Sequence, residues 1–397
     1  MRILLVAPEP FLEVRGTPIN VLNMCRALAG AGHEVHLATF PMGEDVRMDG
    51  LTIHRCPRVP GLRRVPIGFS WTKALLDVLL AARVALLLAT SRFHVVHAVE
   101  ESVFFCLPLA RLARLPMIYD LDSIISEQLR YEHVITSEFL LGIVRRLERR
   151  AVRKADCVLT VCSALSDYVS SVAPGARIFQ IEDAPLDSAV REPDPSEVQR
   201  LRRELGLEGR LVVMYTGNIA KYQGLDLLLG SIGPVVKARP DVRFVLVGVE
   251  ESGGRELRAR AAESGVDGHL VMCGRQPPER MPEFMGMADL LVSPRSEGTN
   301  TPMKIFTYMR SGRPIVATDL PTHTQVLDPS VAFLAPASRE GLAATILRAL
   351  SDPQGAAAMA RTAREKAERE FSYEVFSGKL LEMYRFIERR AAAGRPS

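Results

Sequence analysis

The loop Gly-Thr-Asn-Thr-Pro, which lies between the apolar runs DLLVSP and PIVAT, offers several groups that could bind an anion. Thr301 can cap a helix through its side-chain oxygen, and Pro302 suits the first helical position. The backbone amides of Gly298, Thr299 and Asn300 would then gather at the positive end of that helix. A strand, a loop and a helix start in this order form a common phosphate site, although an ordinary strand-to-helix turn has the same pattern.

Composition excludes several classes of site. The 397 residues exceed one ordinary core, and 47% hydrophobic with 24% charged residues is typical of a folded chain. A net charge of +4 and the lack of a zinc-finger spacing argue against nucleic-acid binding. The cysteines form no CxxC pair, which indicates reduced thiols and neither a disulfide nor a metal site: Cys25, Cys56, Cys106, Cys157, Cys162 and Cys273.

Short apolar runs alternate with helical patterns along most of the chain, beginning with RILLVA, NVLNMCRALAGAG and HEVHLAT. Repeated strand-helix-strand units predict parallel sheets with helices on both faces. The pattern stops at the proline-rich, charged segment 183–200, which we interpret as a linker, and restarts at RLVVMYTG. We therefore predict two doubly wound α/β domains, over 1–185 and 186–373, with their ligand loops facing a cleft.

Two further features concern the ends of the pattern. No GxGxxG motif follows the first strand, so a dinucleotide site is not indicated. The final stretch, 374–392, is predicted to be an amphipathic helix because its apolar residues share one side: Phe376, Leu380, Met383, Tyr384 and Ile387.

The sequence also contains segments that could contact a membrane. The apolar run 73–90 carries Lys73, Asp77 and Arg83, so we expect a buried helix and not a membrane span. The loop RVPGLRRVPIGFSW mixes arginines with Phe69 and Trp71, and could rest on an anionic surface or fold its aromatics inward. The segment around Glu148 has the same two interpretations, a solvated face or a lipid contact, because it is rich in basic residues: Arg145, Arg146, Arg149, Arg150, Arg153 and Lys154.

In its order of motifs the chain resembles the family 4 glycosyltransferases, which are retaining, metal-independent enzymes of the GT-B fold. RGTPINVLNMCRALAGAGHEVHLAT resembles the glycine loop, first helix and second strand of that family. LERRAVRKADCVLTVCSAL, YTGNIAKYQGLDLLL, YMRSGRPIVATD and FSYEVFSGKLLEMYRFIERR follow in the family order. The resemblance covers nearly the whole chain, and it implies that the terminal helix crosses back to the first domain.

The resemblance also implies that the 298–302 loop holds the diphosphate and sugar of a nucleotide-sugar donor. The paired glutamates of the family fall on Thr299 and Thr307, while Glu297 lies two residues early. A neutral threonine would give the ribose a weaker contact than a carboxylate.

The arginine and lysine that bind the diphosphate in the family fall on Asn218, after Gly217, and on Gln223. Lys221 and Lys304 are the nearest replacements, and we favour Lys304 because a cation at a helix start is disfavoured unless an anion lies close. Arg295 could face the cleft or form an internal salt bridge.

A few residues of the implied site lie outside these loops. Arg275 belongs to the CGRQ segment, near which such folds often recognise the base through backbone groups. In the first domain, Asp122 replaces the family histidine and is a candidate base, with Asp120 on the same face of its strand as a competitor. A strand-end capping role is the alternative for both aspartates. His97 is a candidate for acceptor contact.

Gly16 and Thr17 would approach the phosphates from the first domain, although Arg15 replaces one glycine of the usual pair. The resemblance thus implies transfer of a sugar from a UDP- or GDP-linked donor to a hydroxyl of a polysaccharide or lipid-linked acceptor, without a metal ion. It implies a cytoplasmic protein, with contact to the inner face of the cytoplasmic membrane as a further possibility. A sugar-nucleotide epimerase and a non-catalytic sugar-nucleotide binder are the alternatives.

Overall fold

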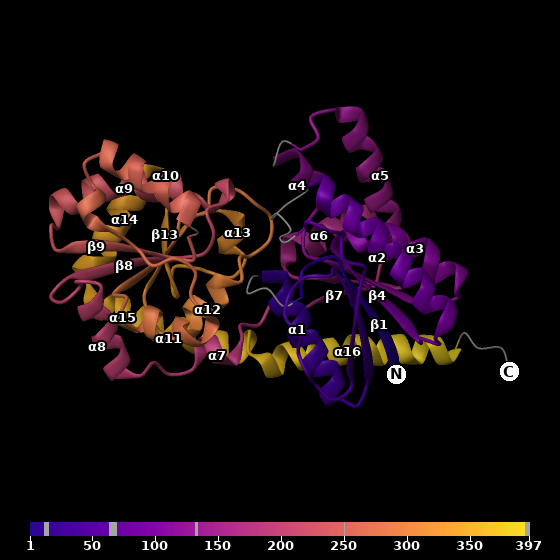
Figure 1. The fold of residues 1–397 in the computed structure, drawn as a ribbon. Coiled ribbons are helices and arrows are strands. Elements are labelled where there is room, and N and C mark those ends of the chain that lie inside the picture. Colours follow the sequence, from indigo (N-terminus) through magenta and orange to yellow (C-terminus); the bar gives the residue numbers. More distant parts are fainter. Residues whose placement is uncertain (12–15, 63–69, 132–133, 250, 394–397) are drawn as a thin grey trace. The chain divides into compact units, whose positions relative to one another are not determined.

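The computed structural model describes residues 1–11, 16–62, 70–131, 134–249 and 251–393 (Figure 1). The chain divides into two compact units. Unit 1 contains residues 1–183 and 374–397, and unit 2 contains residues 184–373. The change from one unit to the other falls two residues before the expected boundary at 185.

Unit 1 contains a parallel sheet with the strand order β3-β2-β1-β4-β5-β6-β7. Its central strands are buried on both faces, which explains why they read as continuous apolar runs. The strands are β1 (Arg2–Ala7), β2 (Glu34–Thr39), β3 (Leu51–Arg55), β4 (Val95–Val99), β5 (Met117–Leu121), β6 (Cys157–Thr160) and β7 (Ile178–Gln180).

Helices cover both faces of this sheet (Figure 1). One face carries α1 (Gly16–Gly30) and α16 (Tyr373–Ala393). The other face carries α2 (Trp71–Thr90), α3 (Val103–Leu112), α5 (Glu138–Lys154) and α6 (Ser163–Val172), with α4 (Ile125–Tyr131) packed on α5. The terminal helix packs within unit 1 as expected, and its predicted apolar side is buried: Phe376, Leu380, Met383, Tyr384 and Ile387.

Unit 2 contains a second parallel sheet with the order β10-β9-β8-β11-β12-β13. Alternate residues of its strands pack into two different cores. Met214 of β8 packs on one face of the sheet, and Tyr215 packs on the other. The strands are β8 (Leu211–Thr216), β9 (Val242–Val247), β10 (Leu270–Met272), β11 (Leu290–Ser293), β12 (Ile315–Thr318) and β13 (Phe333–Ala335).

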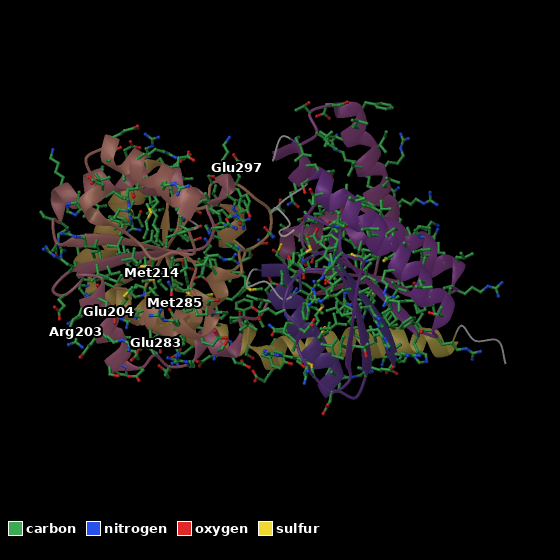
Figure 2. The ribbon with its side chains drawn as sticks, viewed as in Figure 1. Arg203, Glu204, Met214, Glu283, Met285 and Glu297 are labelled. Atoms are coloured by element: carbon green, nitrogen blue, oxygen red, sulfur yellow. The ribbon has the colours of Figure 1, made fainter. Side chains whose placement is uncertain are left out.

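The two cores of unit 2 are closed by two layers of helices. The core that holds Met214 and Met285, both labelled in Figure 2, lies under α8 (Pro195–Glu204), α11 (Met281–Gly286), α12 (Lys304–Arg310) and α15 (Pro353–Glu370). The core that holds Tyr215 lies under α9 (Leu225–Ala238), α10 (Glu251–Glu263) and α14 (Arg339–Ser351). Short helices α7 (Asp187–Val190) and α13 (Pro321–Thr324) complete the unit.

The prediction of a linker over 183–200 is wrong. This segment contains α7 and the first part of α8, and both helices pack on α11 of unit 2. Asp194 caps α8 by accepting from Ser196 N at 2.8 Å, and Pro195 occupies the first turn. The charge and proline that suggested a linker therefore belong to a helix start and to the exposed side of a helix.

The apolar run 73–90 forms most of α2, as expected for a helix of the folded core. Leu76, Leu80 and Val84 point into the unit and are fully buried. Among the helices that the structure describes, none has the length and hydropathy needed to cross a bilayer.

Candidate functional site

Each sheet reverses its strand order once, and the candidate residues gather at these points. The reversal lies between β1 and β4 in unit 1 and between β8 and β11 in unit 2. In open α/β sheets, ligands bind beyond the carboxyl ends of the strands at such a reversal. The segments 217–224 and 294–303 follow β8 and β11, so most donor candidates lie at the reversal of unit 2.

Glycines allow the two loops of unit 2 to approach each other closely. Gly224 has a φ of 71°, and a Cβ there would lie 1.9 Å from the carbonyl oxygen of Pro294. Next to it, Ser296 N donates to Tyr222 O at 3.0 Å. Gly217 has a φ of 139° and donates its amide to Val247 O at 2.8 Å. These positions fix the backbone around the candidate anion site.

Lys304, the first residue of α12, lies between these loops. Its Nζ donates to Gln223 Oε1 at 2.8 Å and lies 4.0 Å from the centre of the Tyr215 ring. A Cβ at Gly217 would come within 3.1 Å of the same nitrogen. Burial, followed by repulsion from Arg295, lowers the pKa of Lys304 well below its usual range. Among the residues described, no carboxylate pairs with this lysine, so an anionic ligand would supply the missing charge.

Arg295 organises the loop that follows β11. Its Nη1 donates to Asn300 O at 2.8 Å and to Thr322 Oγ1 at 3.0 Å, and its Nη2 donates to Asn300 Oδ1 at 3.1 Å. The guanidinium also lies over the Tyr222 ring, 5.0 Å from its centre. Within the site, Arg295 therefore holds the loop by hydrogen bonds to neutral groups and adds positive charge next to Lys304.

The predicted role of Thr301 as a helix cap is wrong. The helix begins at Lys304, and Pro302 and Met303 supply the first carbonyl acceptors, to Ile305 N at 2.9 Å and Phe306 N at 3.1 Å. Thr301 is 3% exposed, and its Oγ1 has no hydrogen-bond partner within the described parts of the chain. The chain turns once more at Pro302 before the helix starts, which moves the threonine away from the capping position.

The other loop candidates are divided between structural and open positions. Asn218 accepts from Tyr215 Oη through its carbonyl oxygen at 2.7 Å, and its side-chain oxygen accepts from Ala220 N at 3.1 Å. Thr299 O accepts from Gln325 Nε2 at 3.0 Å. Both residues therefore help to shape the loops.

Four further candidates differ in how far their side chains are exposed to solvent. Lys221, Arg275 and Glu297 are exposed, and Figure 2 shows Glu297 at the surface of unit 2. Thr307 is half-buried on α12. The ribose and base contacts of these residues stay predictions.

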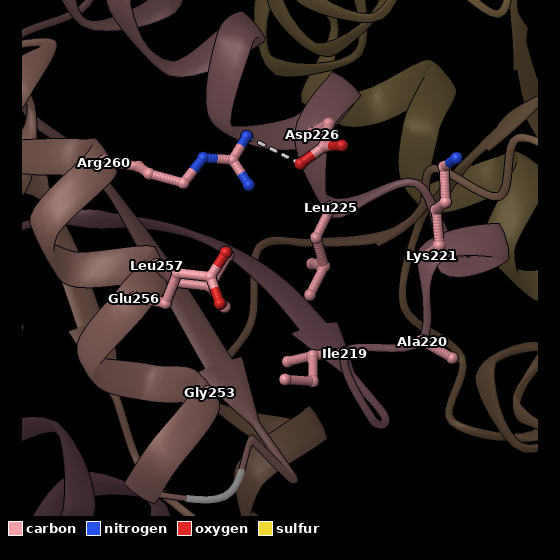
Figure 3. Close-up of a pocket in the computed structure, with 9 residues that line it drawn as sticks. All are labelled: Ile219, Ala220, Lys221, Leu225, Asp226, Gly253, Glu256, Leu257 and Arg260. Carbon is pink, nitrogen blue, oxygen red and sulfur yellow. Dashed lines mark ion pairs between the residues drawn. The ribbon is translucent and has the colours of Figure 1, made fainter.

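A small pocket lies beside the site without coinciding with it (Figure 3). It is lined by Ile219, Ala220 and Lys221 of the loop after β8, by the start of α9, and by one side of α10. Asp226 and Arg260 form an ion pair at 2.6 Å across one end. Of the candidate residues only Lys221 borders this pocket, and Lys304 does not.

Unit 1 carries a pair of buried carboxyl groups at the carboxyl end of β5. Asp120 is fully buried and Asp122 is 8% exposed. Burial raises the pKa of Asp120 to about 7, and burial together with the neighbouring Asp120 raises the pKa of Asp122 well above its usual range. Each carboxyl group affects the titration of the other, so the raised pKa values belong to the pair. Thr17 of α1 also bonds Asp122, which connects the glycine loop to the pair.

His97 differs from its prediction as an acceptor contact. It lies within β4 and is fully buried. Its Nδ1 lies 2.7 Å from Tyr384 Oη and its Nε2 lies 3.4 Å from Asp120 Oδ2, so protein groups face both nitrogens. Burial lowers the pKa of His97 to about 3, and the ring is therefore neutral. Its Nε2 and the Asp120 oxygens have no hydrogen-bond partner among the described residues, and the fully buried ring does not present a nitrogen at the surface.

Sequence reasoning missed three acidic residues near this pair. Glu100 and Glu101 directly follow β4, and repulsion from Asp122 and Glu101 adds to the burial that raises the pKa of Glu100. Glu100 has a φ of 51°, a strained value that often marks a functional site. Asp183 has a raised pKa from burial and from the same aspartates. The signal was available for Glu100, because it stands at the carboxyl end of a strand beside the reversal.

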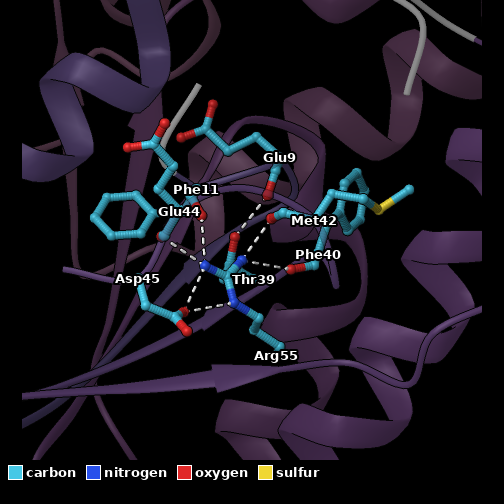
Figure 4. A network of polar contacts seen from close by, with 8 residues as sticks. All are labelled: Glu9, Phe11, Thr39, Phe40, Met42, Glu44, Asp45 and Arg55. Carbon is cyan, nitrogen blue, oxygen red and sulfur yellow. Dashed lines mark hydrogen bonds and ion pairs between the residues drawn. The ribbon is translucent and has the colours of Figure 1, made fainter. Parts of the chain in front are cut away.

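Arg55 was also missed, and it joins the segments that follow β1 and β2 (Figure 4). Its guanidinium donates to the carbonyl oxygens of Phe11 at 2.7 Å, Met42 at 2.5 Å and Glu44 at 2.7 Å. It also contacts Asp45 Oδ1 at 2.9 Å. The loops after β1 and β2 are thus held by one side chain from β3.

Some predictions fall outside the described residues. Arg15 of the glycine loop belongs to them, as does the 63–69 part of the basic and aromatic loop, including Phe69. Gly16 begins α1, with its backbone exposed.

Comparison with known proteins agrees with this geometry. Residues 15–182 match the family described as "Glycosyl transferase 4-like domain", and residues 210–352 match the family described as "Glycosyl transferases group 1". The two matches together cover most of both units.

Two curated relatives extend the comparison. The chain is 26% identical over 397 residues to a phosphatidyl-myo-inositol mannosyltransferase of Mycolicibacterium smegmatis, covering 98% of this chain and 94% of the relative. It is 27% identical over 248 residues to a 2-deoxystreptamine glucosyltransferase of Streptomyces kanamyceticus, covering 61% of this chain and 63% of the relative. The chain thus spans slightly less than two thirds of the second relative.

Solved structures share the fold. Sucrose-phosphate synthase from Thermosynechococcus elongatus has a TM-score of 0.82 at 18% identity, covering 98% of this chain and 99% of that one. Anabaena Alr3699/HepE in complex with UDP-glucose has a TM-score of 0.75 at 19% identity, covering 97% and 99%. With two parallel-sheet units, the order of motifs and both family matches, the chain belongs to the family 4-like glycosyltransferases of the GT-B fold.

Proposed function

We propose that this glycosyltransferase moves a sugar from a UDP- or GDP-linked donor to a hydroxyl of a glycan or lipid-linked acceptor, with retention at the anomeric carbon and without a metal ion. Unit 2 binds the donor, and unit 1 binds the acceptor. The nucleotide-sugar is a co-substrate, and no other cofactor takes part.

The environment of Lys304 carries this proposal. Lys304 is half-buried and next to a second cation, and its one hydrogen bond to the described residues goes to a neutral amide. Such a charge is electrostatically unfavourable in the empty protein. The charge is also placed at the start of α12, where the helix dipole opposes it. A diphosphate would satisfy Lys304 and the dipole together, which supports a donor site at this reversal.

The chemistry follows from the charge that develops on the leaving group. When the bond between the sugar and the diphosphate breaks, the leaving oxygen gains negative charge, which Lys304 and the Gly217 loop can stabilise without rearrangement. This reduces the need for a metal ion as the electrophile. A new bond to the acceptor oxygen then forms on the face that the diphosphate leaves.

Unit 1 supplies groups that can handle the acceptor proton. Both carboxyl groups have raised pKa values, so an ionised member of the pair is a stronger base than an ordinary carboxylate. We assign Asp122 to the acceptor hydroxyl and Asp120 to the tuning of its pKa. The name of the mannosyltransferase relative, which specifies a phosphatidylinositol acceptor, supports a lipid-linked acceptor among the classes considered.

The test is to incubate the protein with UDP-glucose, UDP-galactose, UDP-N-acetylglucosamine and GDP-mannose in EDTA, and to follow the anomeric protons by NMR. We expect one donor to be hydrolysed slowly, with release of its nucleoside diphosphate and a first product of retained configuration. An inverted product would refute retention, and hydrolysis only after addition of Mg²⁺ would refute metal independence. A C2-epimerised donor would indicate the epimerase, and no conversion at all would indicate a binding protein.

A further inference from the structure

Large apolar side chains are exposed on one face of unit 1. Among the described residues of unit 1, all exposed large hydrophobic side chains lie on α2, α3 and α5. These helices cover the same face of the sheet, with α3 packed between α2 and α5 (Figure 1). The residues are Leu75, Val78 and Leu86 on α2, Leu112 on α3, and Phe139, Leu140, Ile143 and Leu147 on α5.

On α5 the exposed apolar residues form a stripe. Phe139, Ile143 and Leu147 are four residues apart and therefore lie on one side of the helix. Phe139 is 77% exposed, although an aromatic ring is normally placed in a core. The opposite side of α5 is buried: Leu141, Glu148, Ala151 and Val152. The stripe is therefore not the side by which α5 packs on its own unit.

Basic residues continue this exposed side toward the end of the helix. Arg150 and Lys154 follow Leu147 at helical spacing, and Arg146 and Arg153 flank them. Arg149 is also exposed. Together they form a surface, which we call the α5 surface, whose members are Phe139, Leu140, Ile143, Arg146, Leu147, Arg149, Arg150, Arg153 and Lys154.

The α5 surface has almost no neutralising charge. Glu138 pairs with Arg145 at 3.3 Å. Glu148 is buried and accepts from Ile125 N at 2.7 Å and Ser126 Oγ at 2.9 Å. Within the described parts of the chain, no ion pair reaches a basic residue of the α5 surface. The charge is therefore available to an external partner.

We propose that the α5 surface docks on the headgroup region of an anionic lipid bilayer. A stripe of apolar residues continued by basic ones along one helix side is the arrangement that lies in a membrane interface. Phe139, Ile143 and Leu147 would enter the boundary between headgroups and acyl chains, and the basic residues would contact lipid phosphates. The exposed residues of α2 and α3 extend the apolar contact on the same face. This inference does not depend on the proposed sugar transfer.

A second copy of the chain fits the α5 surface less well. A symmetric dimer through this surface would bring two sets of arginines together, and like charges oppose such an interface. A small satellite core, formed by Ile125, Leu129 and Leu141, fixes α5 to α4. The surface is thus presented on a packed helix and does not require folding on contact.

The size of the effect can be estimated from the charges. Each basic residue near an anionic surface increases binding by about fivefold. Replacement of two arginines is therefore expected to weaken binding by about 25-fold at physiological ionic strength. Removal of two apolar side chains from the stripe is expected to weaken binding by at least about tenfold.

The experiment is co-sedimentation of the full chain with phosphatidylcholine vesicles, with or without 30% phosphatidylglycerol, the composition being roughly that of a moderately anionic bilayer. The variants are Arg149→Gln/Arg150→Gln and Phe139→Ser/Ile143→Ser. The matched control is Arg203→Gln/Arg258→Gln, which removes two exposed arginines of unit 2; Figure 2 shows Arg203 at its surface. Circular dichroism melting of each variant serves as the folding control.

We expect the wild type and the control to bind the anionic vesicles and both α5 variants to lose binding with unchanged melting. Absence of wild-type binding, equal binding to neutral vesicles, or full binding by the α5 variants would overturn the proposal. Concentration-dependent dimers that the Phe139→Ser/Ile143→Ser variant abolishes, without vesicle binding by the wild type, would instead assign the surface to a second copy.

Discussion

Replacement of Lys304 by methionine gives opposite expected effects on ligand binding and on folding. Methionine is apolar and of similar length, so it keeps the volume near Tyr215 while it removes the charge. A hydrogen bond from a charged group contributes about 1.5–3 kcal/mol, so we expect the affinity for the correct nucleoside diphosphate to fall by about 10- to 150-fold. The affinity falls because the diphosphate loses the Lys304 amine, and the fold stays intact.

The stability of the empty protein is expected to increase or stay equal. The variant loses the bond to Gln223 Oε1 at 2.8 Å and the contact with the Tyr215 ring, but it no longer buries a cation beside Arg295. Replacement of a buried charge by a packed apolar group is commonly neutral or stabilising by about 1–4 kcal/mol. For a unit of this size, each kcal/mol raises the Tm by about 2–4 °C.

Proton linkage gives a second, independent signal. Because the pKa of Lys304 is lowered in the folded protein, the unfolded chain binds a proton that the folded chain releases. Stability from this group therefore increases as the pH rises from the folded-state pKa toward the ordinary value of 10.5. A diphosphate beside the amine raises that pKa again, so binding should take up a proton.

The assay is isothermal titration calorimetry with UDP, GDP and ADP, in two buffers of different ionisation enthalpy, with melting curves of the empty proteins. The matched control is Lys237→Met, an exposed lysine of α9. A rescue variant, Gln223→Lys with Lys304→Gln, exchanges the two hydrogen-bonding partners and should recover much of the affinity. The reasoning is refuted if Lys304→Met binds as tightly as the wild type, or if it loses affinity only together with a large loss of stability.

Three further predictions concern unit 1. In Asp120→Asn, loss of the neighbouring charge should lower the raised pKa of Asp122, so the acidic limb of the kcat/KM profile should move to lower pH. An unmoved limb would contradict the assignment of the pair. Burial, and then repulsion from Glu101, raises the pKa of Asp77 to about 8. The folded chain therefore holds a proton that the unfolded chain loses near pH 3.8. As a result, the contribution of this group to stability declines as the pH rises between those two values. Asp77→Asn should therefore raise the Tm more at pH 9 than at pH 5, and an equal change at both would exclude this linkage. Arg55→Lys cannot reproduce the bonds to Phe11, Met42 and Glu44, and urea unfolding should reveal a loss of about 2–4 kcal/mol, whereas a loss below about 1 kcal/mol would mean that the loops hold without the guanidinium.

The fold was largely predictable because its strands are buried on both faces. In β1, Ile3 to Ala7 are all fully buried, so the sequence reads as an unbroken apolar run. The short strands β3, β7 and β13 were not predicted, since they are partly exposed and only three to five residues long. They become strands through pairing with a neighbour, and local sequence carries little of that information.

The linker error has a different origin, because the necessary signal was local. Asp194 followed by Pro195 is a regular helix start, with an acceptor at the cap and proline in the first turn. Proline and charge are equally typical of a linker and of the first turn of an exposed helix, and only their order distinguishes the two.

Site residues could be predicted where their contacts are local in the sequence, and not where the contacting residues lie far apart in the chain. Gly217 and the loop before α12 could be assigned from motifs, since each is a local feature. The contact between His97 and Tyr384 joins residues 287 positions apart. A histidine at the end of an apolar run therefore looked available for an acceptor, whereas the terminal helix covers it.

The substitutions in the donor site indicate that a positive charge has moved to another position in the sequence and has not been lost. The family resemblance places a cationic side chain at position 223, where this chain has glutamine. The amine of Lys304 lies 2.8 Å from the Oε1 of that glutamine, so a positive charge occupies nearly the same place but comes from α12. The glutamine now orients the lysine that replaces it. A buried cation that destabilises the empty protein is not expected in a site without a ligand. Binding of an anionic donor at this place would explain the presence of Lys304.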